Sequence, residues 1–168
     1  MIIKDIAVFN PKGIKSKSSI NYIDTSSVED GRLLDIQHLT DNFPSRAQRV
    51  IMKNDILISS VRPILRHNYF VSKDIEDGVA STGFIQLRVT SDNVSPQFLY
   101  YFLTTDNKIK EYQAIAETSQ STFPSFNKEV IETMDFPDIS LKQQLYIVDT
   151  SLTKIPFLSS TYFVSYPQ

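Results

Sequence analysis

Two stretches of the chain collect positively charged and small hydroxyl side chains at close spacing. The first, GIKSKSSINYIDTSS, directly follows Lys12 and contains Lys15 and Lys17. The second, RAQRVIMKNDILISSVRP, begins at Arg46 and ends at Pro63. Cations beside hydroxyl groups offer charge and hydrogen-bond donors. Neither stretch contains an obvious catalytic companion, so their residue types indicate contact with a ligand more than bond-making chemistry.

Catalytic constellations are missing from the rest of the sequence. The four glycines are too scattered to form a phosphate-cradling loop. His38 and His67 lack metal-ligand spacing, and no serine or threonine is marked by a neighbouring base. There is neither an Asn-Pro-Pro-Tyr-like methylation motif nor an acidic pair followed by Glu-x-Lys, as in restriction nucleases. The sequence therefore predicts a protein that is not an enzyme, with no cofactor and no metal.

The bulk composition is that of a globular protein. The 168 residues suit one domain plus an appendage, and 41% hydrophobic with 21% charged residues is ordinary for such a chain. The absence of cysteine suits a reducing cytosol. Lys4 and Asp5 interrupt the apolar N-terminus, and no later run approaches the roughly 18 apolar residues of a membrane span. We expect a cytoplasmic protein with no membrane contact.

Charge is segregated along the chain although the net charge is only −2. A nucleic-acid-binding domain is usually strongly basic, so such a function must rest on local charge here. The segment 43–69 carries five arginines and lysines against Asp55 alone, whereas acids cluster in DIEDG at 74–78. Two interpretations stay open: ordinary solvated surface charges, or one cationic face.

The elements that would position these residues begin with strands. Segments 22–25, 48–52 and 55–61 are short and rich in β-branched residues, and the pattern VIMKNDILIS predicts a hairpin turning at Lys53-Asn54. NYFVSK and VASTGFIQLRV predict another hairpin, which turns at Asp77-Gly78. Its inward-facing residues are expected to be Phe84, Leu87 and Val89.

Helices follow the strands. Ser95-Pro96 has the form of an N-cap followed by a first-turn proline. The residues after it have near-helical spacing and are predicted to be core: Phe98, Leu99, Phe102, Leu103, Ile109 and Tyr112. Ser140 and Gln143 have capping-box spacing, and Pro156 ends the helix that they begin. Its apolar residues have the spacing of a coiled-coil seam: Leu141, Leu145, Val148, Leu152 and Ile155. Packing of an amphipathic helix on its own domain explains the pattern equally well.

Five segments resemble, in order, one target recognition domain of a type I restriction-modification specificity subunit, running into its helical spacer. They are YIDTSSVEDGRL, SRAQRVIMKNDILISSVRP, ASTGFIQLRV, PQFLYYFLTT and STFPSFNKEVIETMDFPDISLKQQLYIVD. This resemblance covers roughly residues 1–150 and implies an α+β fold, a twisted β-sheet with flanking helices and a short C-terminal coiled-coil-like helix. We expect a recognition domain at 1–139, the start of the spacer helix at 140–155 and an irregular tail at 156–168.

The resemblance also implies a function. Specificity subunits are non-catalytic; they read a bipartite duplex DNA target, one half-site per recognition domain. They also hold a DNA methyltransferase subunit and, through the complex, a motor-nuclease (restriction) subunit. This sequence has one recognition domain and a spacer helix that stops at Pro156, which leaves a homodimer open. The alternatives are a truncated interaction module or remnant with weak or no DNA binding, and a small nuclease.

Candidate DNA-binding residues follow from charge and loop position. Reading duplex DNA requires cations for phosphates, and polar side chains on loops for base edges. We expect the lysine-rich loop to contact phosphate and the loop from Arg62 to Asn68, stiffened by Pro63, to contact bases. The predicted residues are Lys12, Lys15, Lys17, Arg46, Arg49, Arg62, Arg66, His67, Asn68, Ser119, Gln120, Ser121 and Thr122.

Overall fold

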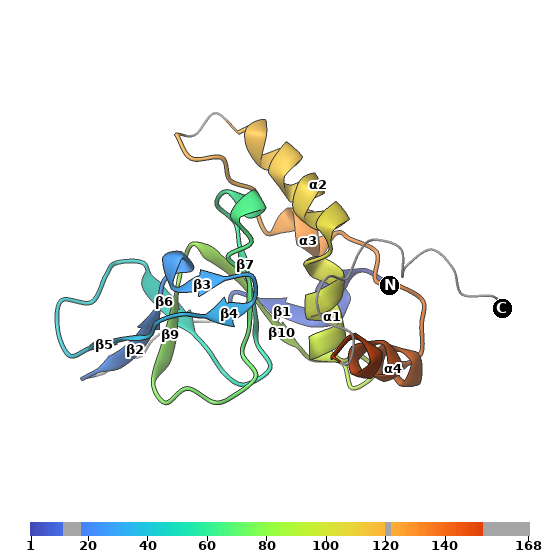
Figure 1. Ribbon diagram of the computed structural model, residues 1–168, viewed down its shortest axis with the longest axis horizontal. Coiled ribbons are helices and arrows are strands. Elements are labelled where there is room, and N and C mark those ends of the chain that lie inside the picture. The colour runs from blue at the N-terminus through green and yellow to red at the C-terminus, as the bar shows by residue number, and fades with distance from the viewer. Residues whose placement is uncertain (12–17, 120–121, 153–168) are drawn as a thin grey trace.

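The computed structural model describes residues 1–11, 18–119 and 122–152. Its ten strands form two four-stranded sheets and one short hairpin (Figure 1). The first sheet has the order β1 (Ala7–Phe9), β10 (Phe84–Val89), β7 (Ile56–Ser59) and β8 (Tyr69–Phe70). The second has the order β5 (Gln37–Leu39), β2 (Ile20–Ile23), β9 (Gly78–Ser81) and β6 (Ala47–Val50). The hairpin pairs β3 (Val28–Glu29) with β4 (Arg32–Leu33).

Helices lie on one side of this β region. They are α1 (Pro96–Leu103), α2 (Asp106–Glu117), α3 (Glu129–Glu132) and α4 (Leu141–Leu152), with 3-10 turns η1 (Ile3–Asp5), η2 (Thr25–Ser27) and η3 (Pro63–Leu65). In Figure 1 the second sheet lies at the left, α2 extends at the top and α4 lies at the lower right. The expected α+β fold is confirmed, with two sheets where one twisted sheet was expected.

Both expected hairpins are wrong, because the strands that follow each other along the chain pair elsewhere. β6 pairs with β9, whereas β7 pairs with β10 and β8. Every residue of β7 is buried, so this strand needs a neighbour on each side, while the half-exposed β6 suits an edge. Asn54 does adopt the expected turn conformation, with φ of 71°. Likewise β8 pairs with β7, and β9 pairs with β2 and β6.

The main core lies between the first sheet and the helices. Ser95 Oγ accepts the Phe98 backbone N–H at 3.3 Å, which confirms the predicted N-cap. Phe98, Leu99 and Tyr112 are fully buried, as expected. The helical segment is interrupted at Thr104-Thr105, which divides it into α1 and α2. The Thr104 hydroxyl donates to the Tyr100 carbonyl at 2.8 Å and so caps the end of α1.

The last helix, α4, packs on its own domain. Ser140 and Gln143 form the expected capping box: Gln143 Oε1 accepts the Ser140 N–H at 2.9 Å, and Ser140 Oγ accepts the Gln143 N–H at 3.3 Å. Val148 is buried in the core, but Leu145 is 51% exposed, so the residues of the expected seam are not equally buried. The Leu152 side chain, Ile155 and the tail fall outside the described residues.

The contacts of Gln144 explain which side of α4 faces the domain. Its side chain is fully buried; Oε1 accepts the Ser95 N–H at 2.9 Å, and Nε2 donates to the carbonyls of Asn93 and Ile139, each at 3.1 Å. A buried amide that satisfies three backbone groups fixes the helix face turned toward α1. Within the described turns, the side of α4 that carries Gln144 and Val148 is therefore docked onto the domain.

Candidate nucleic-acid interface

Two neighbouring segments of the sequence and a distant third meet at one end of β6 and β7. The Arg62 N–H donates to the Pro124 carbonyl at 2.9 Å, and the Phe126 N–H donates to the Ser60 carbonyl at 3.0 Å. The turn between β9 and β10 joins them, because the Thr82 N–H donates to the Arg46 carbonyl at 2.8 Å and the Ser60 N–H donates to the Gly83 carbonyl at 3.0 Å. These backbone bonds place segments 46–49, 60–62 and 122–128 beside one another.

This junction gathers four cations, which we call the basic rim: Arg46, Arg49, Arg62 and Lys128. Arg49 and Lys128 line one hollow of about 400 Å³. The polar side chains around it belong to Asn10, Arg49, Ser60, Thr82, Asn127, Lys128 and Glu129. The rim is thus assembled from three segments, two of which carried predicted cations.

Arg46 and Arg49 differ in their environments although both come from the β6 segment. Arg46 is exposed, and Gly83 leaves room for it: a Cβ at Gly83 would lie 3.1 Å from Arg46 Nη2. Arg49 is half-buried, and its buried Nε has no hydrogen-bond partner among the described residues. Burial lowers the pKa of Arg49, since the charged guanidinium loses water.

The exposed guanidinium of Arg62 packs against an aromatic ring. It adopts a left-handed backbone conformation with φ of 46°, and its guanidinium carbon lies 4.9 Å from the centre of the Phe123 ring. Phe123 is itself 55% exposed. Such cation–π contacts are worth about 0.5–1 kcal/mol at exposed sites and restrict the arginine to one orientation. The pair presents a pre-oriented guanidinium to solvent.

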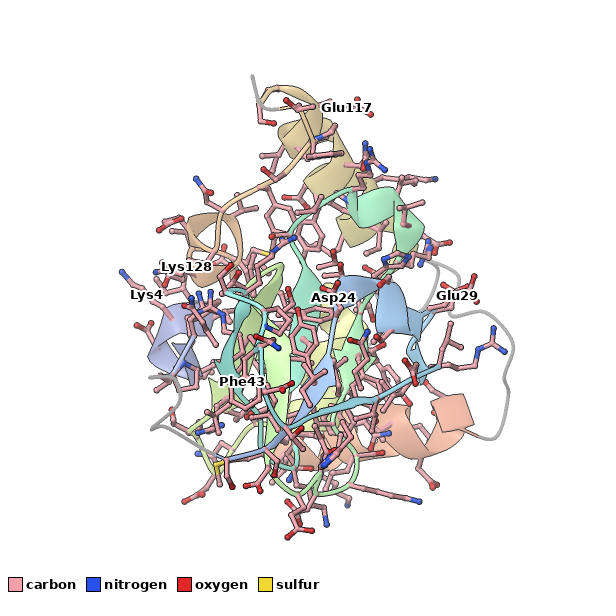
Figure 2. The ribbon with its side chains drawn as sticks, turned by 90° about the vertical axis from the view of Figure 1, so that its left-hand side faces the viewer. Lys4, Asp24, Glu29, Phe43, Glu117 and Lys128 are labelled. Carbon is pink, nitrogen blue, oxygen red and sulfur yellow. The ribbon has the colours of Figure 1, made fainter. Side chains whose placement is uncertain are left out.

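Acidic residues limit the positive charge at one end of the rim. Lys128 forms ion pairs with Glu132 and, at 3.7 Å, with Glu129. The hydrogen bond to Glu132 raises the pKa of Lys128. In the view of Figure 2, Lys128 lies at the left, Asp24 lies near the middle and Glu117, the last residue of α2, lies at the top. The free positive charge of the rim therefore lies at its arginines.

The predicted base-reading loop from Arg62 to Asn68 is divided by the structure. Arg66 Nη2 lies 2.6 Å from Asp106 Oδ1 of α2, and Arg66 lines a separate hollow of about 410 Å³ beside Tyr100. Asn68 is only 4% exposed, and its Oδ1 accepts the Ser59 N–H at 2.9 Å. Because this amide is committed inside the fold, the interface leaves Asn68 out. His67 is half-buried beside it.

The remaining predicted residues have mixed positions. Thr122 is exposed next to Phe123, while Ser119 is half-buried and its Oγ accepts the Ser125 N–H at 3.4 Å. The residues outside the described part of the chain are Lys12, Lys15, Lys17, Gln120 and Ser121. Sequence reasoning missed Phe123, Asn127 and Lys128, although they lie within the STFPSFNKEV motif that signalled the family.

None of the helices in the described residues is both long and apolar enough to cross a membrane. No group of three or more histidine, aspartate or glutamate side chains in the same residues is placed to hold a metal ion.

The structure is an α+β domain whose loops carry the cations of the basic rim. The family model described as type I restriction modification DNA specificity domain matches residues 3–150. The chain belongs to this family, so the expected family is confirmed. A specificity domain is a non-catalytic component, and this agrees with the absence of catalytic motifs from the sequence.

Individual relatives give the same picture. The chain is 28% identical over 138 residues to the HindI specificity subunit of Haemophilus influenzae; the match covers 80% of this chain and 30% of that protein. The HsdS subunit from Thermoanaerobacter tengcongensis has a TM-score of 0.75 at 22% identity, covering 89% of this chain and 40% of that chain.

A second solved structure, which concerns assembly and conformational transition of the type I R-M system, has a TM-score of 0.66 at 18% identity. It covers 86% of this chain and 41% of that chain. The two structures share the fold. The chain spans less than half the length of each relative. It therefore corresponds in size to a single recognition domain.

Proposed function

We propose that this domain binds duplex DNA through the basic rim and reads one half of a bipartite target. The observation that carries the proposal is the convergence of Arg46, Arg49 and Arg62 in a chain of net charge −2. These arginines come from segments 46–49 and 60–62, and segment 122–128 is hydrogen-bonded to the second of these. Phosphate contacts need unpaired cations on a shared surface. None of these arginines forms an ion pair with a described residue, which supports that role.

Within the rim, Arg62 is the proposed base-reading residue. A guanidinium can donate two parallel hydrogen bonds to the O6 and N7 acceptors of guanine in the major groove. The Phe123 ring orients Arg62 before binding, which reduces the entropy lost on contact. Lys12, Lys15 and Lys17 belong to the segment that follows Asn10 at the hollow, and we assign them to phosphate contacts.

A random duplex library selected on the wild-type chain tests this assignment. The selected duplex and a scrambled duplex are then titrated with Arg62→Ala and with Arg46→Ala by fluorescence anisotropy at several salt concentrations. Arg62→Ala should cost about 1–3 kcal/mol on the selected duplex and much less on the scrambled one. Arg46→Ala should weaken both equally. Equal losses for both variants on both duplexes would contradict base reading by Arg62.

We also propose that the exposed side of α4 contacts the DNA methyltransferase subunit in a cytoplasmic complex that includes the restriction subunit. Leu145 and Tyr146 are 51% and 64% exposed there, next to each other on a helix whose opposite side is docked. Co-purification with the methyltransferase should be lost in Leu145→Glu and kept in Lys142→Gln, which changes the same helix. A wild-type chain that pairs with itself and ignores the methyltransferase, by light scattering, would instead indicate a homodimer.

A further inference from the structure

Arg49 is an arginine that has no counterion within the part of the chain that the structure describes. Three arginines of the described chain are half-buried: Arg49, Arg66 and Arg88. Arg66 pairs with Asp106 at 2.6 Å, and Arg88 pairs with Asp55 at 2.7 Å. Arg49 pairs with no described carboxylate, and its Nε is buried without a hydrogen-bond partner. Partial burial of an unpaired charge is costly, so an anion at the part of the guanidinium that still faces solvent would offset that cost.

The hollow beside Arg49 has room and donors for such an anion. Its volume of about 400 Å³ exceeds that of a phosphate group, and it opens to solvent on the rim. Thr82 and Asn127 line it, and their side chains form no hydrogen bond with another described residue. Ser60 contributes less, because its hydroxyl already donates to the Gly83 carbonyl at 2.9 Å.

The acid at the hollow is already paired. Glu129 lies in its lining, and its Oε1 is 3.7 Å from Lys128 Nζ. Lys128 also pairs with Glu132, so the charge of Glu129 is only partly offset, but the lining still holds two cations, Arg49 and Lys128, against this one acid. The hollow therefore presents a net positive centre with neutral donors around it, which favours an anion of tetrahedral oxygens over a cation or an apolar group.

We infer that this hollow is a seat for one backbone phosphate of DNA, bound by Arg49 with Thr82 and Asn127. The inference rests on the proposed function and adds the atom-level anchor that sets register. Arg46 and Arg62 lie on the same rim, so a phosphate held at Arg49 fixes how far the Arg62 guanidinium reaches toward a base. Phosphate contacts position a protein on the duplex, and base contacts then specify the sequence.

The Nε–H resonance of Arg49, observed by 1H–15N NMR, reports directly on the seat. Inorganic phosphate, and then a short duplex, should shift this resonance saturably, whereas chloride at equal ionic strength should not. Binding of the duplex with an unmoved Arg49 resonance would overturn the seat and leave the proposed function intact. Shifts with phosphate but no binding of any duplex would keep an anion site and remove the proposed function.

Salt dependence supplies a second readout. Removal of one phosphate contact lowers the slope of log affinity against log salt by about 0.9. Between about 50 and 200 mM salt, Arg49→Gln should therefore lose about 3.5-fold less affinity than the wild type, on selected and scrambled duplexes alike. Arg49→Lys keeps the charge and should keep the slope. Lys142→Gln, which removes an exposed charge on α4, is the matched control. Equal slopes in wild type and a folded Arg49→Gln would overturn the seat.

Discussion

Replacing Asp55 with alanine removes a carboxylate that ties β10 to the ends of β6 and β7. Asp55 is fully buried, and its oxygens accept four hydrogen bonds: from the Met52 N–H, from Gln86 Nε2, and from Nε and Nη2 of Arg88, at 2.7–2.8 Å. Gln86 Nε2 also donates to the Val50 carbonyl at 2.8 Å. The network therefore fixes the strand that carries Arg49.

The cost of this substitution can be worked from these contacts. Loss of one partner of a fully buried ion pair costs about 3–5 kcal/mol. Arg88 is 32% exposed and can regain water, which places the ion-pair loss at the low end of that range. Met52 N–H and the buried Gln86 amide lose an acceptor, and each unsatisfied group costs about 1–3 kcal/mol. Since these losses overlap, we expect Asp55→Ala to lower the free energy of unfolding by about 3–4 kcal/mol.

Urea unfolding followed by circular dichroism measures this loss, and an unchanged denaturant slope shows that the unfolded state is comparable. Asp35→Ala, at an exposed position, is the control and should stay within about 0.5 kcal/mol of the wild type. Arg88→Met alone strands the buried carboxylate, so the double variant with Asp55→Ala should be more stable than the sum of the single losses by at least about 1 kcal/mol. A loss below about 1 kcal/mol for Asp55→Ala, or strictly additive variants, would refute a buried network of this strength.

Three further outcomes follow from the packing. Ser95→Ala should lower the free energy of unfolding by about 1 kcal/mol in urea, because α1 loses its N-cap; no change would show that the cap is dispensable. Val148→Ala should lower the free energy of unfolding by about 2 kcal/mol, while Leu145→Ala on the exposed side of α4 should lower it by less than about 0.5 kcal/mol. The reverse order would contradict the side of α4 that the structure buries. Arg66→Ala should cost less than about 1 kcal/mol, because its pair with Asp106 is a third exposed, and should leave base preference in the duplex selection unchanged; an altered preference would return Arg66 to the interface.

Local patterns in the sequence predicted local structure well. The caps at Ser95 and Ser140, the turn at Asn54 and the buried helical stripe all depend on residues within one or two turns of each other. Strand pairing was predicted wrongly, because it depends on burial across the whole sheet. β7 is buried at every residue and takes a central place, which separates it from β6 despite the short connection between them.

Local patterns likewise predicted only the part of the candidate site that is close together in sequence. Arginines 46, 49 and 62 were visible as a cluster in sequence, and the structure brings them together. Phe123 and Lys128 join them only through the pairing of 60–62 with 124–126, a contact between segments separated by about sixty residues that no local pattern encodes. The predicted loop is divided because η3 has a left-handed residue at each end, φ 46° at Arg62 and 53° at Arg66. This geometry sends one side chain to the rim and the other to α2.

Net charge is a poor guide to this surface because the fold neutralises its arginines selectively. Arg66 and Arg88 are half-buried against Asp106 and Asp55, so two cations and two acids offer little to a polyanion. The rim arginines have no such partner among the described residues, and a phosphate chain would meet them at full charge. A mildly acidic protein can thus present unpaired arginines on one surface while other arginines pair with acids inside the fold. Thr82→Asp would place an acid beside Arg49 and should weaken duplex binding. Thr90→Asp adds the same charge at an exposed position and should weaken binding less.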